Sequence, residues 1–175
     1  MGCDCHFYTE RWTNQKNYEG PKDTQTDRDI KLNSILQNEE YEHQEYAWVT
    51  ADTWYWEDTY WRADEYYHDR NYFLFAILAD VRNQFRIDPL SEPRGIPADS
   101  CYPIKYIVNE WKGDGHSHSY FTLKELLDVD WGKYCVKLPE VDRTDWLDDF
   151  KQSLNELKEV DSNPENVRCV FFFDN

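Results

Sequence analysis

The sequence lacks long apolar runs. No stretch approaches the roughly 20 consecutive apolar residues that a membrane-spanning helix needs, and the start lacks the basic and apolar segments of a secretory signal. The opening Met1-Gly2-Cys3 is found in some lipidated proteins, but the myristoylation pattern has Ser or Thr at position 6, where this chain has His6. We therefore expect a cytoplasmic protein that does not associate with membranes.

Paired cysteine motifs are also missing. The five cysteines form an odd set without CxxC spacing, which argues against a disulfide framework and against a zinc ribbon. We expect most of them to be small buried residues in a reducing compartment. The motifs GxSxG, GxGxxG, HExxH and the P-loop are absent as well. A nucleophilic pair of Cys5 and His6 is excluded because adjacent strand residues face opposite ways.

Basic residues are scarce. Nineteen Lys and Arg stand against 35 Asp and Glu, for a formal net charge of −16. This charge argues against duplex nucleic acid and against anionic membrane surfaces as partners. It permits binding to a basic protein surface, or a metal-carboxylate site that neutralises phosphate. The segment 39–69 holds ten acidic residues and ten Tyr or Trp, which could either fill a core or form a contact face.

The pattern of apolar residues predicts one compact α+β domain over residues 1–175. Residues 3–12 alternate like a strand, and the apolar run from Val167 is typical of a central strand buried on both faces. Trp54 and Trp56 indicate a further strand. Helical spacing predicts helices near 70–82 (with Asp69 as N-cap), 122–129 (with a Thr122/Glu125 capping box) and 145–160. We expect the two terminal strands to be neighbours in a central sheet, with these helices packed against it. Residues 13–38 and 84–103 are expected to be loops.

Two Asp-x-His units are the main candidates for chemistry. Asp4 and His6 form the first, and Asp114, His116 and His118 form the second. On extended backbone, residues two apart share a face and could bind one ion. Imidazole with carboxylate suits Zn²⁺, Mn²⁺ or Fe²⁺, so we expect Asp4, His6, His116 and His118 as metal ligands and Asp114 as a catalytic base. The alternative is structural, because Asp-Gly is a common turn pair and His-x-His alone is a modest signal.

Arginines next to Asn or Gly are candidates for holding an anion. Arg70 and Arg94 could bind an anionic group through bidentate hydrogen bonds. Pairing with nearby carboxylates is the alternative, and for Arg82 it is the preferred one.

Five motifs, read together, resemble an uncharacterised family of small bacteriophage and bacterial proteins, whose members typically begin Met-Gly-Cys-Asp-Ile-His. They are, in chain order, MGCDCHFYTE, DRNYFLFAILADVRN, EPRGIP, DGHSHSYFTLKELLDVDW and VRCVFFFDN. This chain departs from the family at Cys5, where an aliphatic residue is usual, and at Phe172, where Trp is usual. The resemblance implies that the motif positions also include Asn71 and Asp174, which join Arg70 and Arg94 as candidate ligand-binding residues. It brings no mechanism, although a phage setting fits counter-defence in a host cytoplasm.

Two functions follow as hypotheses. The first is a metal-dependent hydrolase of a phosphoester or nucleotide. The second is a non-enzymatic acidic binding protein, which either inhibits a host or defence factor or sequesters a small signalling nucleotide. The expected partner is accordingly a small anionic ligand or a host protein. The oligomeric state is not predicted.

Overall fold

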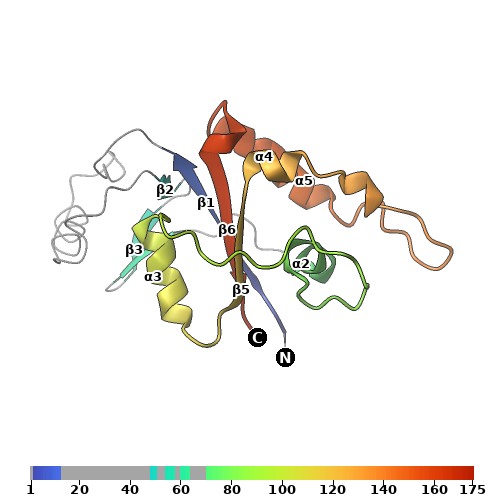
Figure 1. The fold of residues 1–175 in the computed structure, drawn as a ribbon, viewed down its shortest axis with the longest axis horizontal. Coiled ribbons are helices and arrows are strands. Elements are labelled where there is room, and N and C mark those ends of the chain that lie inside the picture. The colour runs from blue at the N-terminus through green and yellow to red at the C-terminus, as the bar shows by residue number, and fades with distance from the viewer. Residues whose placement is uncertain (1, 13–47, 51–53, 58–59, 64–69) are drawn as a thin grey trace.

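The fold is a mixed α+β arrangement built on a four-stranded antiparallel sheet. A computed structural model describes residues 2–12, 48–50, 54–57, 60–63 and 70–175. The strand order is β2 (Trp48–Thr50), β1 (Cys5–Trp12), β6 (Val167–Phe173) and β5 (His116–Thr122). The first and last strands are neighbours over their length, with Cys5 opposite Phe173 and Arg11 opposite Val167. The predicted sheet of terminal strands is therefore confirmed (Figure 1).

The central strand β6 is buried on both faces because helices cover each side of the sheet. Cys169, Phe171 and Phe173 point into the larger core, while Val170 and Phe172 point into the smaller one. All five are 0% exposed. This explains why residues 169–173 form a continuous apolar run rather than an alternating one.

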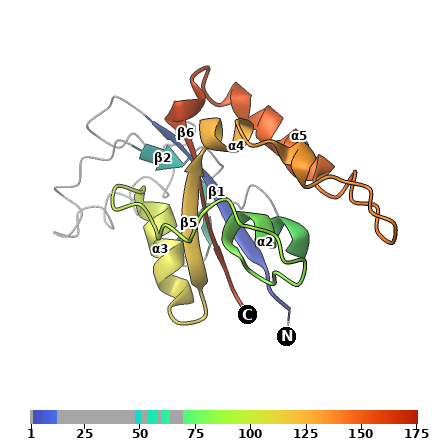
Figure 2. The ribbon, with the colours of Figure 1, turned by 45° about the vertical axis from the view of Figure 1, so that its right-hand side comes forward.

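The larger core lies under α2 (Tyr72–Ala79), α4 (Leu123–Leu127) and α5 (Asp148–Glu156), and the smaller one lies under α3 (Tyr102–Trp111). Figures 1 and 2 show α3 on one side of the sheet and the other three helices on the opposite side. A separate two-stranded hairpin joins β3 (Trp54–Glu57) to β4 (Tyr60–Ala63), so the strand predicted at Trp54 and Trp56 is confirmed.

The three predicted helices are present. The capping box of α4 is formed as expected, because the Thr122 hydroxyl accepts from the Glu125 backbone and the Glu125 carboxylate accepts from the Thr122 backbone. The N-cap of α2 is Asn71 and not Asp69, which lies outside the described residues. The long helix near 145–160 is α5 followed by a short 3-10 turn, Leu157–Glu159.

Strands β2 and β4, helix α3 and strand β5 were not predicted as such. Helix α3 begins inside the segment 84–103, whose four prolines suggested a continuous loop, and β5 begins in the Gly-rich segment, which the site hypothesis took as extended and the alternative took as a turn. No helix in the described part of the chain is long and apolar enough to cross a bilayer.

A buried ion pair lies toward the end of the sheet where β1 ends and β6 begins. Glu10 is 0% exposed and its Oε2 accepts from Arg168 Nε at 2.7 Å, while its Oε1 accepts from the Cys101 backbone N–H at 2.6 Å. Arg168 also donates to Asp99 Oδ1 at 2.9 Å and lies over the ring of Trp48. The pair thus joins β1 and β6 to the start of α3.

Candidate functional site

One end of the sheet gathers the residues that the sequence marked as candidates. Because neighbouring strands are antiparallel, the start of β1, the end of β6 and the start of β5 meet there. We call it the histidine end and define it by Asp4, His6, Trp111, His116, His118, Phe172 and Asp174. Figure 1 shows both chain termini at this end, beside the ends of α2 and α3.

A bulge at Ser117 separates the two histidines of β5. His116 is opposite Phe173 and Ser119 is opposite Phe171, so β5 has one residue more than β6 between these pairs. Ser117 has φ of +50°, a left-handed conformation that a non-glycine residue adopts rarely. As a consequence His116 contacts Phe173 and His118 contacts Phe172, on opposite faces of the sheet. The expectation that residues two apart share a face fails here because the backbone is not regular.

His6 and His118 flank Phe172 in a row across the sheet. The His6 ring is 4.7 Å from the Phe172 ring, and the His118 ring is 5.4 Å away, both nearly parallel to it. Since β1 and β5 are separated by β6, the imidazoles lie roughly 10 Å apart by strand spacing. Trp111 of α3 covers the His6 side at 4.4 Å. The apolar ring of Phe172 therefore occupies the space where a shared ion would bind.

Arg70 engages the carboxylate of Asp4. Its Nε donates to Oδ1 at 2.5 Å and its Nη2 donates to Oδ2 at 2.6 Å, which is a bidentate ion pair. Both side chains are about half exposed. The Arg70 guanidinium holds the pKa of Asp4 below its ordinary value. The predicted metal ligand and the predicted anion-binding residue thus neutralise each other.

Asp174 ties the end of β6 to the start of β1. Its Oδ1 accepts from the Asp4 backbone N–H at 2.8 Å, and its Oδ2 lies 3.4 Å from His6 Nε2. Its own backbone N–H donates to the Asp4 carbonyl at 3.2 Å. The side chain therefore has structural partners of its own, although it lies beside His6 as the site hypothesis requires.

The two histidines of β5 each have a buried ring nitrogen. Nε2 of His116 and Nε2 of His118 make no hydrogen bond, while Nδ1 of His116 lies 3.0 Å from the Ser117 hydroxyl. Burial, with a smaller contribution from His116, lowers the pKa of His118. Across the described residues, no group of three or more His, Cys, Asp or Glu side chains is placed to hold a metal ion.

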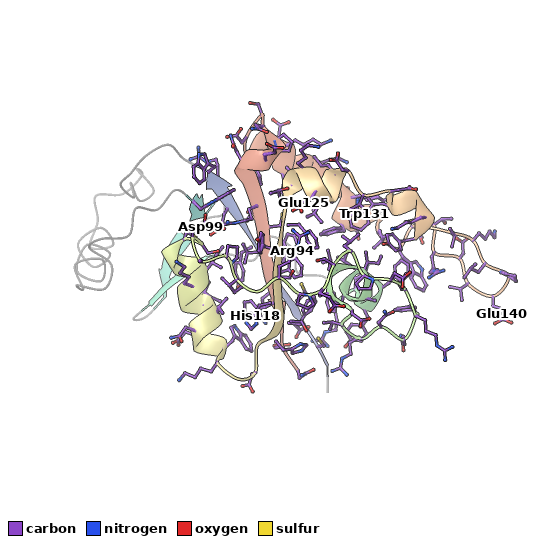
Figure 3. The ribbon with its side chains drawn as sticks, viewed as in Figure 1. Arg94, Asp99, His118, Glu125, Trp131 and Glu140 are labelled. Carbon is purple, nitrogen blue, oxygen red and sulfur yellow. The ribbon has the colours of Figure 1, made fainter. Side chains whose placement is uncertain are left out.

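The remaining candidates lie apart from this row. Asp114 is exposed in the turn after α3. Asn71 is occupied by helix capping, accepting from Leu74 N–H at 3.0 Å and donating to the Trp146 carbonyl at 2.7 Å. Arg94 donates to both oxygens of Glu125, at 2.8 and 3.1 Å (Figure 3). The structure thus brings Asp4, His6, Asp174 and the two histidines to one end of the sheet, but not Arg94 or Asn71.

Arg82, for which we expected pairing with a nearby carboxylate, contacts residues at the two chain termini beside this end. Its Nη2 donates to the side-chain oxygen of Asn175 at 3.2 Å and lies 3.5 Å from the Gly2 carbonyl. Burial raises the pKa of the Cys3 thiol, and Arg82 partly opposes that shift. Arg70 before α2 and Arg82 after it both contact residues near the chain termini. The matching Arg-Asn pairs at the two ends of this helix were the signal in the sequence that could have placed Arg82 there.

Gly115 lies just before β5, close to Trp111, His118 and Phe172. A Cβ there would lie 3.3 Å from Trp111 Cβ and 3.4 Å from both His118 Nε2 and Phe172 Cδ2, whereas one at Gly113 would meet nothing within 4 Å. Since those neighbours are packed against one another, we expect Gly115→Ala to lower the free energy of unfolding by about 1–3 kcal/mol. The matched Gly113→Ala should change it by less than about 0.5 kcal/mol in the same urea titration. Equal effects of the two changes would contradict this packing.

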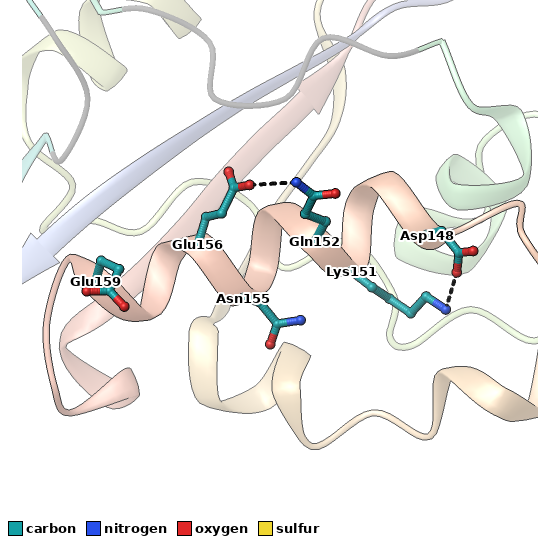
Figure 4. A pocket seen from close by; sticks show the side chains of 6 residues that line it. All are labelled: Asp148, Lys151, Gln152, Asn155, Glu156 and Glu159. Atoms are coloured by element: carbon teal, nitrogen blue, oxygen red, sulfur yellow. Dashed lines mark hydrogen bonds and ion pairs between the residues drawn. The ribbon is translucent and has the colours of Figure 1, made fainter.

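A shallow hollow lies elsewhere, along the outer side of α5. It is lined by Asp148, Lys151, Gln152, Asn155, Glu156 and Glu159 (Figure 4). Lys151 pairs with Asp148 at 2.5 Å, and Gln152 donates to Glu156 at 2.9 Å. The hollow is open and contains no histidine or cysteine.

Comparison of the chain with protein-family models, with curated proteins and with solved structures finds no match.

Proposed function

We propose that this chain is a non-enzymatic binding protein that recognises a basic surface on another protein, such as a host or defence factor. The observation that supports this is the distribution of charge. The two arginines predicted to hold an anion are already neutralised, Arg70 by Asp4 and Arg94 by Glu125, and the buried Arg168 is neutralised by Glu10. A small anionic ligand would have to displace these carboxylates.

Carboxylates, by contrast, remain exposed in the last quarter of the chain. Between residues 140 and 165 eight acidic side chains are exposed, and the same range contains three basic ones. The exposed residues are Glu140, Asp142, Asp145, Asp148, Asp149, Glu156, Glu159 and Glu165. An acidic surface of this kind attracts a basic partner and raises its association rate. The aromatic segment 39–69, our first candidate for the contact face, lies mostly outside the described residues.

Capture from a bacterial extract tests the proposal. The immobilised chain should retain basic proteins at about 0.05 M salt and release them near 0.5 M, since screening shortens the reach of surface charge. The triple change Asp148→Lys, Glu156→Lys and Glu159→Lys should reduce retention, whereas His116→Ala should not. Retention of acidic proteins alone, unaffected by salt, would contradict the proposal.

Duplex DNA should not bind. With a formal net charge of −16, the chain repels phosphates, and we expect no shifted band in an electrophoretic assay at physiological salt. A shift at sub-micromolar concentration would show that a local basic surface overrides the net charge.

A metal-dependent hydrolase is the second candidate, favoured by one observation. The Nε2 atoms of His116 and His118 are buried at the histidine end without a hydrogen-bond partner, and imidazole nitrogen is a common ligand of Zn²⁺, Mn²⁺ and Fe²⁺. In this alternative Asp4, His6, His116 and His118 would be the ligands and Asp114 the base. Because Arg70 holds Asp4 and Phe172 separates His6 from His118, we place it second.

Elemental analysis separates the two candidates. Protein purified without chelator should contain well below one Zn, Mn or Fe per chain, and His116→Ala should leave that content unchanged. A stoichiometric metal that is lost in His116→Ala and in His118→Ala, together with hydrolysis of a phosphodiester substrate, would establish the hydrolase instead.

A further inference from the structure

The segment 136–143, which we call the hairpin arm, projects away from the body of the protein. Figures 1 and 2 show it extending beyond α5, and Figure 3 shows Glu140 at its tip. Its backbone is paired across a two-residue turn. The Leu138 N–H donates to the Val141 carbonyl at 2.8 Å, and the Val141 N–H donates back to Leu138 at 3.3 Å.

The hairpin arm places two apolar side chains on one face. Leu138 and Val141 are directly opposite each other in this antiparallel pair, so their side chains point the same way. Lys137 and Asp142 form the next pair and occupy the other face, with Lys137 Nζ 3.6 Å from Asp142 Oδ2. The arm thus has an apolar face and a charged face.

Exposed apolar side chains are rare in the described part of the chain. The large ones there are Trp12 at 37%, Leu138 at 43% and Val141 at 40% exposed. Trp12 packs edge-on against Trp48, with ring centroids 5.3 Å apart. Leu138 and Val141 instead share a projecting turn. Single exposed apolar residues need no explanation, but an adjacent pair at a projecting tip is typical of a contact site.

The hairpin arm is already ordered before it meets a partner. Besides the two bonds at the turn, the Arg143 N–H donates to the Val136 carbonyl at 3.1 Å. Asp142 Oδ1 accepts from both the backbone and the hydroxyl of Thr144, at 3.1 and 2.8 Å. These hydrogen bonds hold the pKa of Asp142 below its ordinary value. An ordered tip loses little conformational entropy when it is bound.

The charge around the tip indicates which partner it fits. Glu140 is exposed at the tip (Figure 3), Asp145, Asp148 and Asp149 are exposed in the segment that follows the arm, and Arg143 lies over the ring of Phe73. An apolar centre with a charged rim is the usual layout of a protein interface. The acidic rim disfavours a second copy of this chain, which carries the same charge, and disfavours an anionic lipid surface.

We propose that the hairpin arm is the docking element of this protein, and that it inserts Leu138 and Val141 into an apolar pocket rimmed by Lys or Arg on the partner. This inference rests on the proposed function and names the surface that performs it. The apolar pair supplies the contact that is removed from water, and the carboxylates set the choice of partner.

Two short peptides of equal length and charge test the docking element. One is an amphipathic sequence of Leu and Lys, and in the other every Leu is replaced by Ser. The full chain should bind the Leu-Lys peptide about tenfold more tightly than the Ser-Lys peptide in a fluorescence titration at low salt. The double change Leu138→Ser and Val141→Ser should remove that difference and leave the binding of the Ser-Lys peptide unchanged. Trp12→Ser, at the other exposed apolar position, should preserve it.

The outcomes separate the docking element from the proposed function. If the difference between the peptides persists in the double variant, or is absent from the unmodified chain, the hairpin arm is not the docking element, while salt-sensitive binding of the Ser-Lys peptide still supports an acidic binding protein. If neither peptide binds at low salt, the proposed function fails. If sedimentation shows a dimer that the double change dissociates, the occupant is a second copy, and the partner named here is wrong.

Discussion

Phe171→Ala should lower the free energy of unfolding by about 3–5 kcal/mol, because the lost side chain leaves a cavity in the larger core, between the sheet and the helices that cover it. Phe171 is 0% exposed, and its ring stacks on Phe7 at 5.7 Å and on Phe121 at 6.0 Å. Its neighbours come from both flanking strands, so the surrounding structure has little freedom to collapse into the space. Urea denaturation followed by tryptophan fluorescence measures the change.

Leu138→Ala provides the matched control for that experiment. The residue is 43% exposed at the tip of the hairpin arm, so its truncation should cost less than about 1 kcal/mol. A loss under about 1 kcal/mol for Phe171→Ala as well would show that the C-terminal strand is peripheral.

Arg168→Ala should also cost about 3–5 kcal/mol, because it leaves the Glu10 carboxylate buried without its counter-charge. Glu10 is 0% exposed, and its closest contact to Arg168 is 2.6 Å, between Oε2 and Nη2. The same change at the surface ion pair of Lys124 with Asp128 should cost under about 0.5 kcal/mol, since solvent screens that pair. Similar losses at the two sites would contradict the burial of the pair.

The pH dependence of Arg168→Ala tests the cause of that loss. Burial raises the pKa of Glu10 above its ordinary value of 4.5, so the folded chain retains a proton that the unfolded chain releases. Stability therefore falls as pH rises above that ordinary value, and it should fall further once Arg168 is removed. Replacing both residues, Glu10→Leu with Arg168→Met, should recover most of the stability at neutral pH and remove this pH dependence.

The strands at the two ends of the chain could be predicted because their patterns are simple. Residues from Val167 onward form an apolar run that is interrupted only by Arg168, which is the pattern expected of a central strand covered on both faces. The buried α2 and the capping box at Thr122 were equally clear in the sequence. Helix α3 was missed because the prolines before it, including Pro97, extended the apparent loop into a segment whose helical pattern is short.

The location of the candidate site could be predicted from the sequence, but the arrangement of its side chains could not. The topology does bring His6, His116 and His118 to one end of the sheet. The bulge at Ser117 could not be predicted, because Ser is not a residue that signals a left-handed backbone, and the bulge turns His116 away from His118. Nor does local spacing reveal that Arg70, far along the chain, would pair with Asp4.

The ionic-strength dependence of the association rate tests the binding account most directly. For a basic partner purified from the capture experiment, the rate constant should fall by about tenfold or more between low and physiological salt, while the dissociation rate changes little. Charge reversal at Asp148, Glu156 and Glu159 should slow association in the same way, and His116→Ala should not. An association rate that is independent of salt would contradict the account. Binding that is lost in His116→Ala but kept after charge reversal would also contradict it and would favour a binding site at the histidine end.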